Sequence, residues 1–178
     1  MYKTVVFDLD GTLLNTLTDL ADAGNRLCRK YGWPTHERQA YRYFVGNGIP
    51  KLVERLAPAD QRTPAVLEAA LADFKRDYGQ HLRDTTAPYP GIPEMLAKLK
   101  TNGVQLAVFS NKADALAKEV VKDYFGTQYF TIVRGQMTGV APKPAAEGTN
   151  ALLQALHADP ASTLYVGDSN VDVETAHN

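Results

Sequence analysis

The chain has 178 residues, of which 44% are hydrophobic, so it can bury a real core as one domain, or as one domain that carries an insertion. Its 19 basic and 20 acidic residues give a formal net charge of -1, which argues against a protein that binds nucleic-acid phosphates. One cysteine, Cys28, excludes a disulfide framework, and we find no signal-peptide core and no apolar run of membrane-spanning length. We therefore expect a cytoplasmic protein that binds neither nucleic acid nor membrane.

The first predicted strand covers residues 4–10, and its apolar start runs directly into Asp8 and Asp10, followed by Gly11-Thr12. Alternate residues of a strand face the same side, so the two carboxylates are expected to converge. Converging carboxylates repel each other unless a cation or a shared proton compensates their charge. The pair indicates a metal site, acid–base chemistry or both, and the plain alternative is a polar turn that closes the strand.

Residues 16–86 contain no convincing strand and show several amphipathic helical stripes. Pro88-Tyr89-Pro90-Gly91 then marks the return to the first pattern. We interpret residues 16–86 as a helical cap inserted into a core domain made of residues 1–15 and 87–178.

Strands and helices alternate in the rest of the chain. Strands are predicted at 104–111 and 163–168, with a weaker one at 129–134, and helices at 93–101, 114–123 and 144–157. This alternation predicts an α/β fold with a Rossmann-like parallel sheet and right-handed crossovers. Ligands of such sheets bind beyond the carboxyl ends of the strands.

Four polar clusters follow strands or begin helices in this pattern. They are Asp8 with Asp10, then Ser110-Asn111-Lys112, then Lys143, and finally Gly167-Asp168-Ser169 with Asp172. Each alone has an ordinary explanation as a helix cap, a turn or a solvated charge. Together at one sheet edge they favour phosphoryl transfer, which needs a carboxylate nucleophile, a proton donor, a hard cation such as Mg²⁺, and groups that hold the phosphoryl oxygens.

The order and spacing of these clusters resemble those of haloacid dehalogenase superfamily phosphatases with a helical cap. The superfamily pattern is Asp-x-Asp, then Ser or Thr, then Lys, then Gly-Asp-x-x-x-Asp. In this chain the pattern falls on Asp8 to Asp10, Ser110, Lys143 and the segment 167–172. The resemblance covers nearly the whole chain and implies a Mg²⁺-dependent phosphomonoester hydrolase that forms an aspartyl-phosphate.

The resemblance also implies a role for each motif residue. Asp8 is the nucleophile and Asp10 the general acid and then the base. The phosphoryl group is bound by Ser110, Asn111 and Lys143; Mg²⁺ is held by Asp8, the Asp10 carbonyl and Asp168; Asp172 and Thr12 support the site.

Within the superfamily, the cap segment 44–55 resembles that of phosphoglycolate phosphatases, which implies a small phosphorylated metabolite, 2-phosphoglycolate, as substrate. Its Gly46-Asn47-Gly48 loop opens a helix with free backbone N–H groups that suit an anion, although a flexible turn between helices fits equally. Arg42 and Lys51 are candidates to meet a substrate carboxylate, or they are solvated charges.

Several alternatives stay open at this point. Similar caps occur in phosphatases of sugar phosphates, nucleotides and pyrophosphate and in phosphomutases, and receiver-type signalling domains share part of the site chemistry. The chain stops at Asn178, where superfamily members continue with a helix, a strand and a helix. The C-terminal part of the core is therefore expected to be missing, which leaves an exposed strand edge, a monomer or an edge-paired homodimer, and an inactive remnant as a further alternative.

Overall fold

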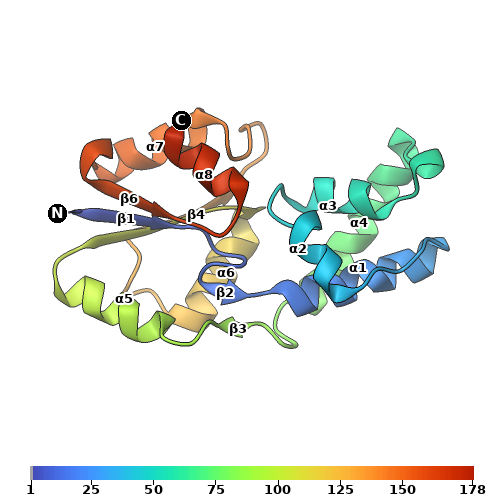
Figure 1. The fold of residues 1–178 in the computed structure, drawn as a ribbon, viewed down its shortest axis with the longest axis horizontal. Coiled ribbons are helices and arrows are strands. Elements are labelled where there is room, and N and C mark those ends of the chain that lie inside the picture. Colours follow the sequence, from blue (N-terminus) through green and yellow to red (C-terminus); the bar gives the residue numbers. More distant parts are fainter. Residues whose placement is uncertain (1) are drawn as a thin grey trace. The chain divides into compact units, whose positions relative to one another are not determined.

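The computed structural model describes residues 2–178 (Figure 1). Contacts between Cα atoms divide the chain into two compact units. The first unit combines the residues up to Asn15 with Ala87–Asn178, and the second is Thr16–Thr86. Among the described residues, no helix has the length and apolar character needed to cross a membrane.

A four-stranded parallel sheet forms the centre of the first unit, in the order β5-β4-β1-β6. Its strands are β1 (Thr4–Phe7), β4 (Gln105–Ala113), β5 (Ile132–Gln136) and β6 (Thr163–Val166). In the register, Val5 is paired with Leu106 of β4 and Leu164 of β6. The predicted Rossmann-like parallel sheet is thereby confirmed.

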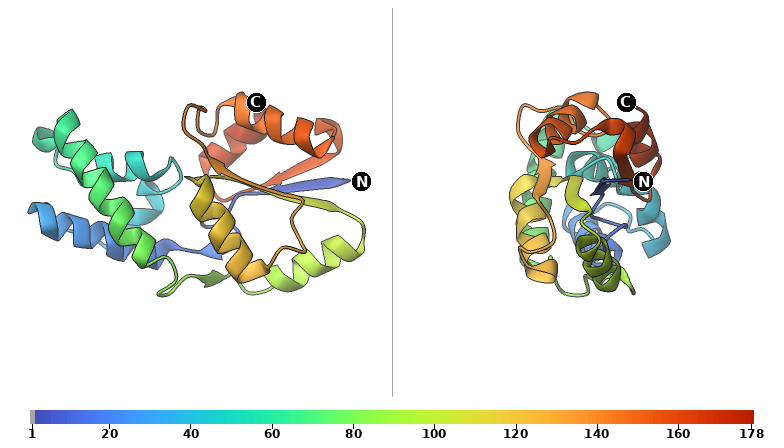
Figure 2. Two further views of the ribbon diagram at one scale, coloured as in Figure 1. Left: turned by 180° about the vertical axis from the view of Figure 1, so that it is seen from behind. Right: turned by 90° about the vertical axis from the view of Figure 1, so that its left-hand side faces the viewer.

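Four helices cover the two faces of this sheet. They are α5 (Ile92–Thr101), α6 (Asp114–Phe125), α7 (Ala146–Leu156) and α8 (Asn170–His177). Helices α5 and α6 lie on one face and α7 and α8 on the other, as seen from the front and from behind (Figures 1 and 2). Val6 and Ala107 of the sheet pack with Leu152 and Leu156 of α7 in a buried apolar cluster.

Several predicted boundaries need correction. Strands β1 and β6 end at Phe7 and Val166, because the acidic residues that follow belong to loops. Strand β4 instead runs on through its polar residues to Ala113, with a register shift after Phe109. The weak strand predicted at 129–134 is β5 at Ile132–Gln136.

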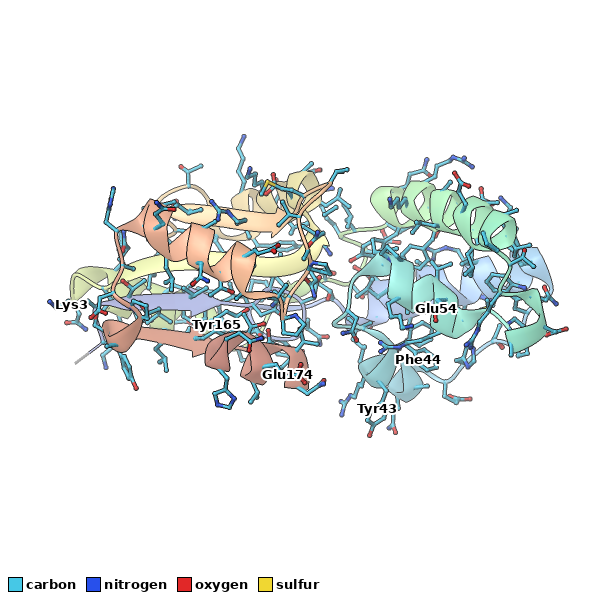
Figure 3. The ribbon with its side chains drawn as sticks, turned by 90° about the horizontal axis from the view of Figure 1, so that it is seen from above. Lys3, Tyr43, Phe44, Glu54, Tyr165 and Glu174 are labelled. Carbon is cyan, nitrogen blue, oxygen red and sulfur yellow. The ribbon has the colours of Figure 1, made fainter. Side chains whose placement is uncertain are left out.

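The second unit is helical, with α1 (Leu17–Tyr31), α2 (Tyr41–Phe44), α3 (Ile49–Leu56) and α4 (Pro64–Gln80). Its described residues form no strand, as predicted. Buried aromatic side chains, among them Tyr41, Phe74 and Tyr78, fill its interior. Tyr43 is different, since 83% of it is exposed (Figure 3).

The two ends of the helical unit are tied together by Asp19 in the first turn of α1. Its buried carboxylate accepts hydrogen bonds from the backbone N–H groups of Thr85 and Thr86, both at 2.9 Å, and from both hydroxyls. Just outside the unit, β2 (Leu14–Asn15) pairs antiparallel with β3 (Ala87–Pro88). The chain segments that enter and leave the helical unit are therefore paired with each other.

Candidate active site

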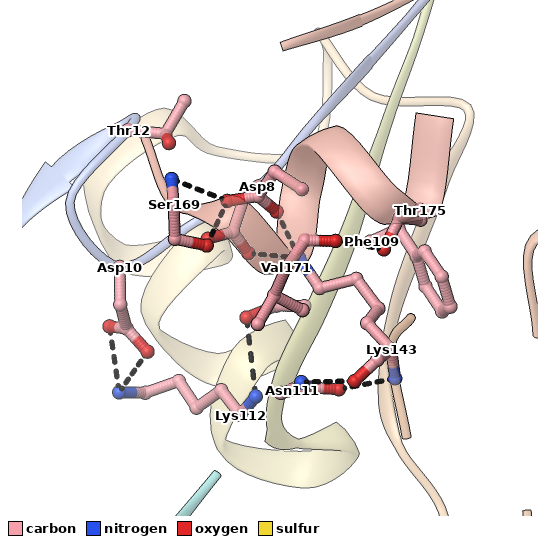
Figure 4. Close-up of polar contacts among 12 residues, drawn as sticks. Asp8, Asp10, Thr12, Phe109, Asn111, Lys112, Lys143, Ser169, Val171 and Thr175 are labelled. Carbon is pink, nitrogen blue, oxygen red and sulfur yellow. Dashed lines mark hydrogen bonds and ion pairs between the residues drawn. The ribbon is translucent and has the colours of Figure 1, made fainter. Parts of the chain in front are cut away.

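The polar residues of the first unit gather at the carboxyl edge of its sheet (Figure 4). Asp8 follows β1, and Asp168 follows β6 by two residues. Ser110, Asn111 and Lys112 lie inside the last part of β4. Parallel strands bring their carboxyl ends together, which is why residues far apart in the sequence meet at this edge.

Lys143 lies at the centre of the cluster, and its side chain is only 2% exposed. Its Nζ donates to Asp8 Oδ1 at 2.9 Å, Asp172 Oδ1 at 2.8 Å and the Tyr165 hydroxyl at 2.9 Å. Burial lowers the pKa of Lys143, but the neighbouring Asp8, Tyr165 and Asp172 outweigh it and raise the pKa above its ordinary value. The ammonium is therefore charged, and each of its three N–H groups has an acceptor.

The carboxyl group of Asp8 is buried, and its pKa lies above the ordinary value. Burial raises the pKa of Asp8 to about 6, Lys143 acts against this, and Asp172 adds to it. Burial likewise raises the pKa of Asp168, whereas Lys143 and Ser169 overcome the effect of burial and lower the pKa of Asp172. The site thus holds more negative charge at neutral pH than Lys143 alone offsets.

Three carboxylates of the described residues are close enough to share a cation. One oxygen each of Asp8, Asp168 and Asp172 lies within 4.8 Å of the others. However, Asp172 Oδ1 accepts from Lys143, while its Oδ2 accepts from the Ser169 backbone at 3.0 Å and hydroxyl at 2.7 Å. Asp8 and Asp168 are therefore the better candidates, and their oxygens suit a hard divalent ion.

Gly11 and Thr12 shape the surroundings of Asp168. The Thr12 hydroxyl donates to Asp168 Oδ1 at 3.1 Å. Gly11 has a φ of +89°, and a Cβ added there would collide with the Asp168 carboxylate. Both the backbone conformation and the close approach therefore require glycine at position 11.

Strand alternation does not place Asp10 beside Asp8, because both residues lie beyond the end of β1. Asp10 is part of a turn in which the Leu13 and Leu14 N–H groups both donate to the Leu9 carbonyl. Its carboxylate pairs with a different lysine, since Lys112 Nζ lies 3.1 Å from Asp10 Oδ1. The two carboxylates are thus held separately.

The two polar residues before Lys112 are buried and hydrogen-bonded. Asn111 clamps the backbone of Lys143, donating to its carbonyl at 3.1 Å and accepting from its N–H at 2.8 Å. The Ser110 hydroxyl oxygen accepts from the Lys112 N–H at 3.2 Å. Asn111 therefore positions the loop that carries Lys143.

Two residues of this cluster were not predicted as site residues. Lys112 is buried inside β4 and was noted only as the last member of a polar triplet. The Tyr165 side chain comes from β6 (Figure 3), and its hydroxyl contacts Lys143, the Phe109 carbonyl and Asp172. Lys112 directly follows the apolar run of the strand predicted at 104–111, which is a signal that sequence reasoning could have used, whereas a strand tyrosine gives none.

The predicted cap contacts all lie in the second unit. Gly48 precedes α3 with a φ of 82°, and Arg55 donates to the Phe44 carbonyl at 2.8 Å and to Asn47 Oδ1 at 2.9 Å, which orders the loop between them. Lys51 pairs with Glu54 at 2.7 Å. Gly46 has a φ of 113°, and Arg42 is exposed on α2.

The sequence of the chain matches the family described as haloacid dehalogenase-like hydrolase over residues 5–178. A phosphoglycolate phosphatase of Thiobacillus denitrificans is 31% identical over 98% of this chain and 78% of its own length. One of Neisseria meningitidis is 33% identical over 98% of this chain and 75% of its own length.

Solved structures agree with the sequence comparisons. A crystal structure from Lactobacillus delbrueckii subsp. bulgaricus, provisionally described as a phosphoglycolate phosphatase, has a TM-score of 0.93 and 29% identity, and the match covers 99% of this chain and 82% of that one. CbbY from Rhodobacter sphaeroides, solved with phosphate, shares the fold with a TM-score of 0.80 at 21% identity, over 99% of this chain and 82% of that one.

The chain therefore belongs to the haloacid dehalogenase-like hydrolase family. Its similarity to curated phosphoglycolate phosphatases identifies it as a phosphatase within this family. The family generally uses a divalent metal, and the acidic cluster described above provides oxygen ligands of the required kind.

Proposed function

We propose that the protein is a Mg²⁺-dependent hydrolase of 2-phosphoglycolate that works through an aspartyl-phosphate on Asp8. The observation that carries this proposal is the buried Asp8 carboxylate, 2.9 Å from Lys143 Nζ and next to Asp168. A carboxylate held in this way is oriented for attack on phosphorus, and the lysine offsets part of the charge that the phosphoryl group brings.

In the first step an Asp8 oxygen forms a bond to phosphorus while the ester P–O bond breaks. Asp10 gives its proton to the departing alcohol oxygen and becomes a carboxylate. Asp10 then takes a proton from a water molecule, whose oxygen attacks the phosphorus and releases inorganic phosphate and free Asp8. Lys143 and the Ser110 hydroxyl would hold the phosphoryl oxygens, with Asn111 keeping Lys143 in place.

A bound Mg²⁺ supplies positive charge that lowers the repulsion between Asp8 and the phosphate dianion. The carboxylates of Asp8 and Asp168 and the backbone carbonyl of Asp10 would be its protein ligands. The donor set supports this assignment, because Asp172, the third nearby carboxylate, already accepts hydrogen bonds from Lys143 and Ser169.

The proposed substrate rests on the names of the curated relatives and on the loop before α3. We assign the unit Thr16–Thr86 as a cap and the Gly46-Asn47-Gly48 loop as the part that meets the substrate carboxylate. Lys51 is engaged by Glu54, so the exposed Arg42 is the better candidate for a charged contact. Arg55 supports the loop through its bonds to Phe44 and Asn47.

The test is release of inorganic phosphate from 2-phosphoglycolate, sugar phosphates, nucleotides and pyrophosphate, with and without Mg²⁺. We expect 2-phosphoglycolate to give the highest kcat/KM, and Asp8→Asn to lower kcat by more than about 10³-fold. Asp159→Asn is the matched control, because the Asp159 side chain accepts from the Ala161 N–H and lies outside the site.

The outcomes separate the parts of the proposal. Full activity of Asp8→Asn would contradict the aspartyl-phosphate. A higher kcat/KM for another phosphate ester would contradict the substrate but leave the chemistry intact. Activation by a sugar bisphosphate, with phosphate returned to the sugar, would identify a mutase instead.

A further inference from the structure

Lys112 is a buried lysine for which the steps above provide no role. It lies in β4, between β1 and β5 in the sheet, and its side chain is 2% exposed. Lysine is almost never fully buried without a charged partner, because removing its ammonium from water is costly. A buried ion pair is also weak evidence of a stabilising role, since apolar residues often replace such pairs without loss.

Lys112 pairs with the carboxylate of Asp10 and contacts both of its oxygens. Nζ lies 3.1 Å from Oδ1 and 3.4 Å from Oδ2 (Figure 4). The lysine is anchored at its other end, because its backbone N–H donates to the Ser110 hydroxyl oxygen at 3.2 Å. Asp10 lies in a loop, so the lysine links this loop to an interior strand.

We propose that Lys112 is the positioning residue for Asp10: it aims the carboxyl group and compensates the charge that Asp10 gains on giving up its proton. This inference rests on the proposed function, in which the Asp10 proton moves to the departing alcohol oxygen as the P–O bond breaks. The carboxylate formed there keeps Lys112 as its partner until it takes a proton from water. Lys143, which is bound to Asp8 and Asp172, would hold the phosphoryl group. Lys112, which is bound to Asp10, would act on the leaving group through Asp10.

This role predicts a dependence on the leaving group that a purely structural role does not. Phenolate leaves poorly without a proton, whereas p-nitrophenolate is stabilised by its nitro group and leaves as the anion. Phenyl phosphate and p-nitrophenyl phosphate have the same ring and no carboxylate, so they differ mainly in their need for the Asp10 proton. The ratio kcat/KM reports the steps up to release of the phenol and is independent of the later hydrolysis of the aspartyl-phosphate.

The experiment compares kcat/KM for the two esters in the full chain with Mg²⁺. Lys112→Met is expected to lower kcat/KM for phenyl phosphate by about 100-fold or more, the usual contribution of a general acid, and for p-nitrophenyl phosphate by less than about 10-fold. Lys112→Arg keeps the charge and should restore most of the phenyl phosphate activity. Lys118→Met is the matched control, because Lys118 is an exposed lysine paired with Asp114 at 2.7 Å, and both esters should react normally.

Equal losses for the two esters, or no loss for either, would overturn the inference. If Lys112→Met fails to fold, Lys112→Gln keeps a hydrogen-bond donor without the charge and is expected to show the same selective loss. Normal wild-type turnover of 2-phosphoglycolate together with equal losses would refute the role of Lys112 alone. Absence of any Mg²⁺-dependent wild-type turnover would refute the proposed function and this inference with it.

Discussion

At the scale of single residues, the three N–H groups of Lys143 explain much of the site. Two of their acceptors are the carboxylates of Asp8 and Asp172, and the third is the neutral Tyr165 hydroxyl. That hydroxyl has one hydrogen of its own, for which the Phe109 carbonyl at 3.2 Å is an acceptor. Tyr165 thus connects the lysine to the backbone of β4 and limits where the ammonium can lie.

Replacement of Tyr165 by phenylalanine leaves one buried N–H of Lys143 without this acceptor. We expect Tyr165→Phe to lower the free energy of unfolding by about 1–3 kcal/mol, the cost of an unsatisfied buried polar group. Urea denaturation measures this change. Tyr2→Phe is the control, because Tyr2 is 52% exposed and a surface change of this kind stays within about 0.5 kcal/mol. Equal stability of the Tyr165→Phe and wild-type proteins would show that the ammonium finds another partner.

At the scale of elements, charge pairs join α1 and α4 in the helical unit. Arg26 contacts Asp77 with two guanidinium nitrogens, and Lys30 and Tyr31 both bind Asp73, at 2.6 and 2.8 Å. The hydrogen bonds from Lys30 and then Tyr31 lower the pKa of Asp73 below its ordinary value of 3.8. Partly exposed pairs of this kind contribute little stability singly, but the pH dependence of their contribution has a definite sign.

A carboxyl group whose pKa is lowered by folding stabilises the protein above the unfolded pKa. This contribution is lost as the pH falls from 3.8 through the lower pKa of the folded state. Asp73→Asn should therefore lower the unfolding midpoint at neutral pH, and the difference from wild type should shrink in acid. Thermal unfolding as a function of pH measures this, together with NMR titration of the Asp73 carboxyl. A difference that grows in acid would contradict the assignment.

The predictions that failed concern the ends of the strands. The acidic residues after β1 and β6 lie outside the strands, where Asp8 accepts from Lys143 and Asp168 accepts from Thr12. Strand β4 instead retains Ser110, Asn111 and Lys112, since each is buried and finds a polar partner. Hydrophobic patterning predicts where a strand starts better than where it ends, because only tertiary partners decide whether a polar residue stays in it.

At the scale of the whole molecule, the core is built from both ends of the sequence. The helical unit is inserted in the sequence between β2 and β3, and these two short strands pair with each other. The metal site is expected to lie in the core unit alone, because Asp8 and Asp168 both belong to it. Binding of an ion there links the N-terminal strand to the C-terminal motif.

Mg²⁺ should therefore stabilise the folded protein independently of substrate. At a Mg²⁺ concentration 100 times its Kd, the gain is ~2.7 kcal/mol, which raises the unfolding midpoint by several degrees. Asp168→Asn should abolish this shift, while Asp159→Asn should retain it. Thermal unfolding with Mg²⁺ and after its removal by a chelator measures the effect. A full shift in Asp168→Asn would place the ion elsewhere.

The class of fold follows from the sequence, because buried apolar runs that alternate with amphipathic helices have few solutions other than a parallel sheet. It also indicated phosphoryl transfer, because the chemistry is carried by residue types at the ends of predicted strands. The roles of these residues and the function of the cap remain predictions. Most of the error in the strands was confined to where they end.

Which charged side chains pair with each other depends on the tertiary structure. Lys143 and Asp8 are 135 positions apart, Lys112 and Asp10 are 102 apart, and no local pattern says which lysine pairs with which carboxylate. The pairing of lysines with carboxylates depends on the strand order and on where each strand ends. These two features determine which charged side chains lie within a few ångströms of each other at the sheet edge. Coulomb attraction and desolvation act over those distances, so the two separate lysine–aspartate pairs are properties of the fold and not of the motif.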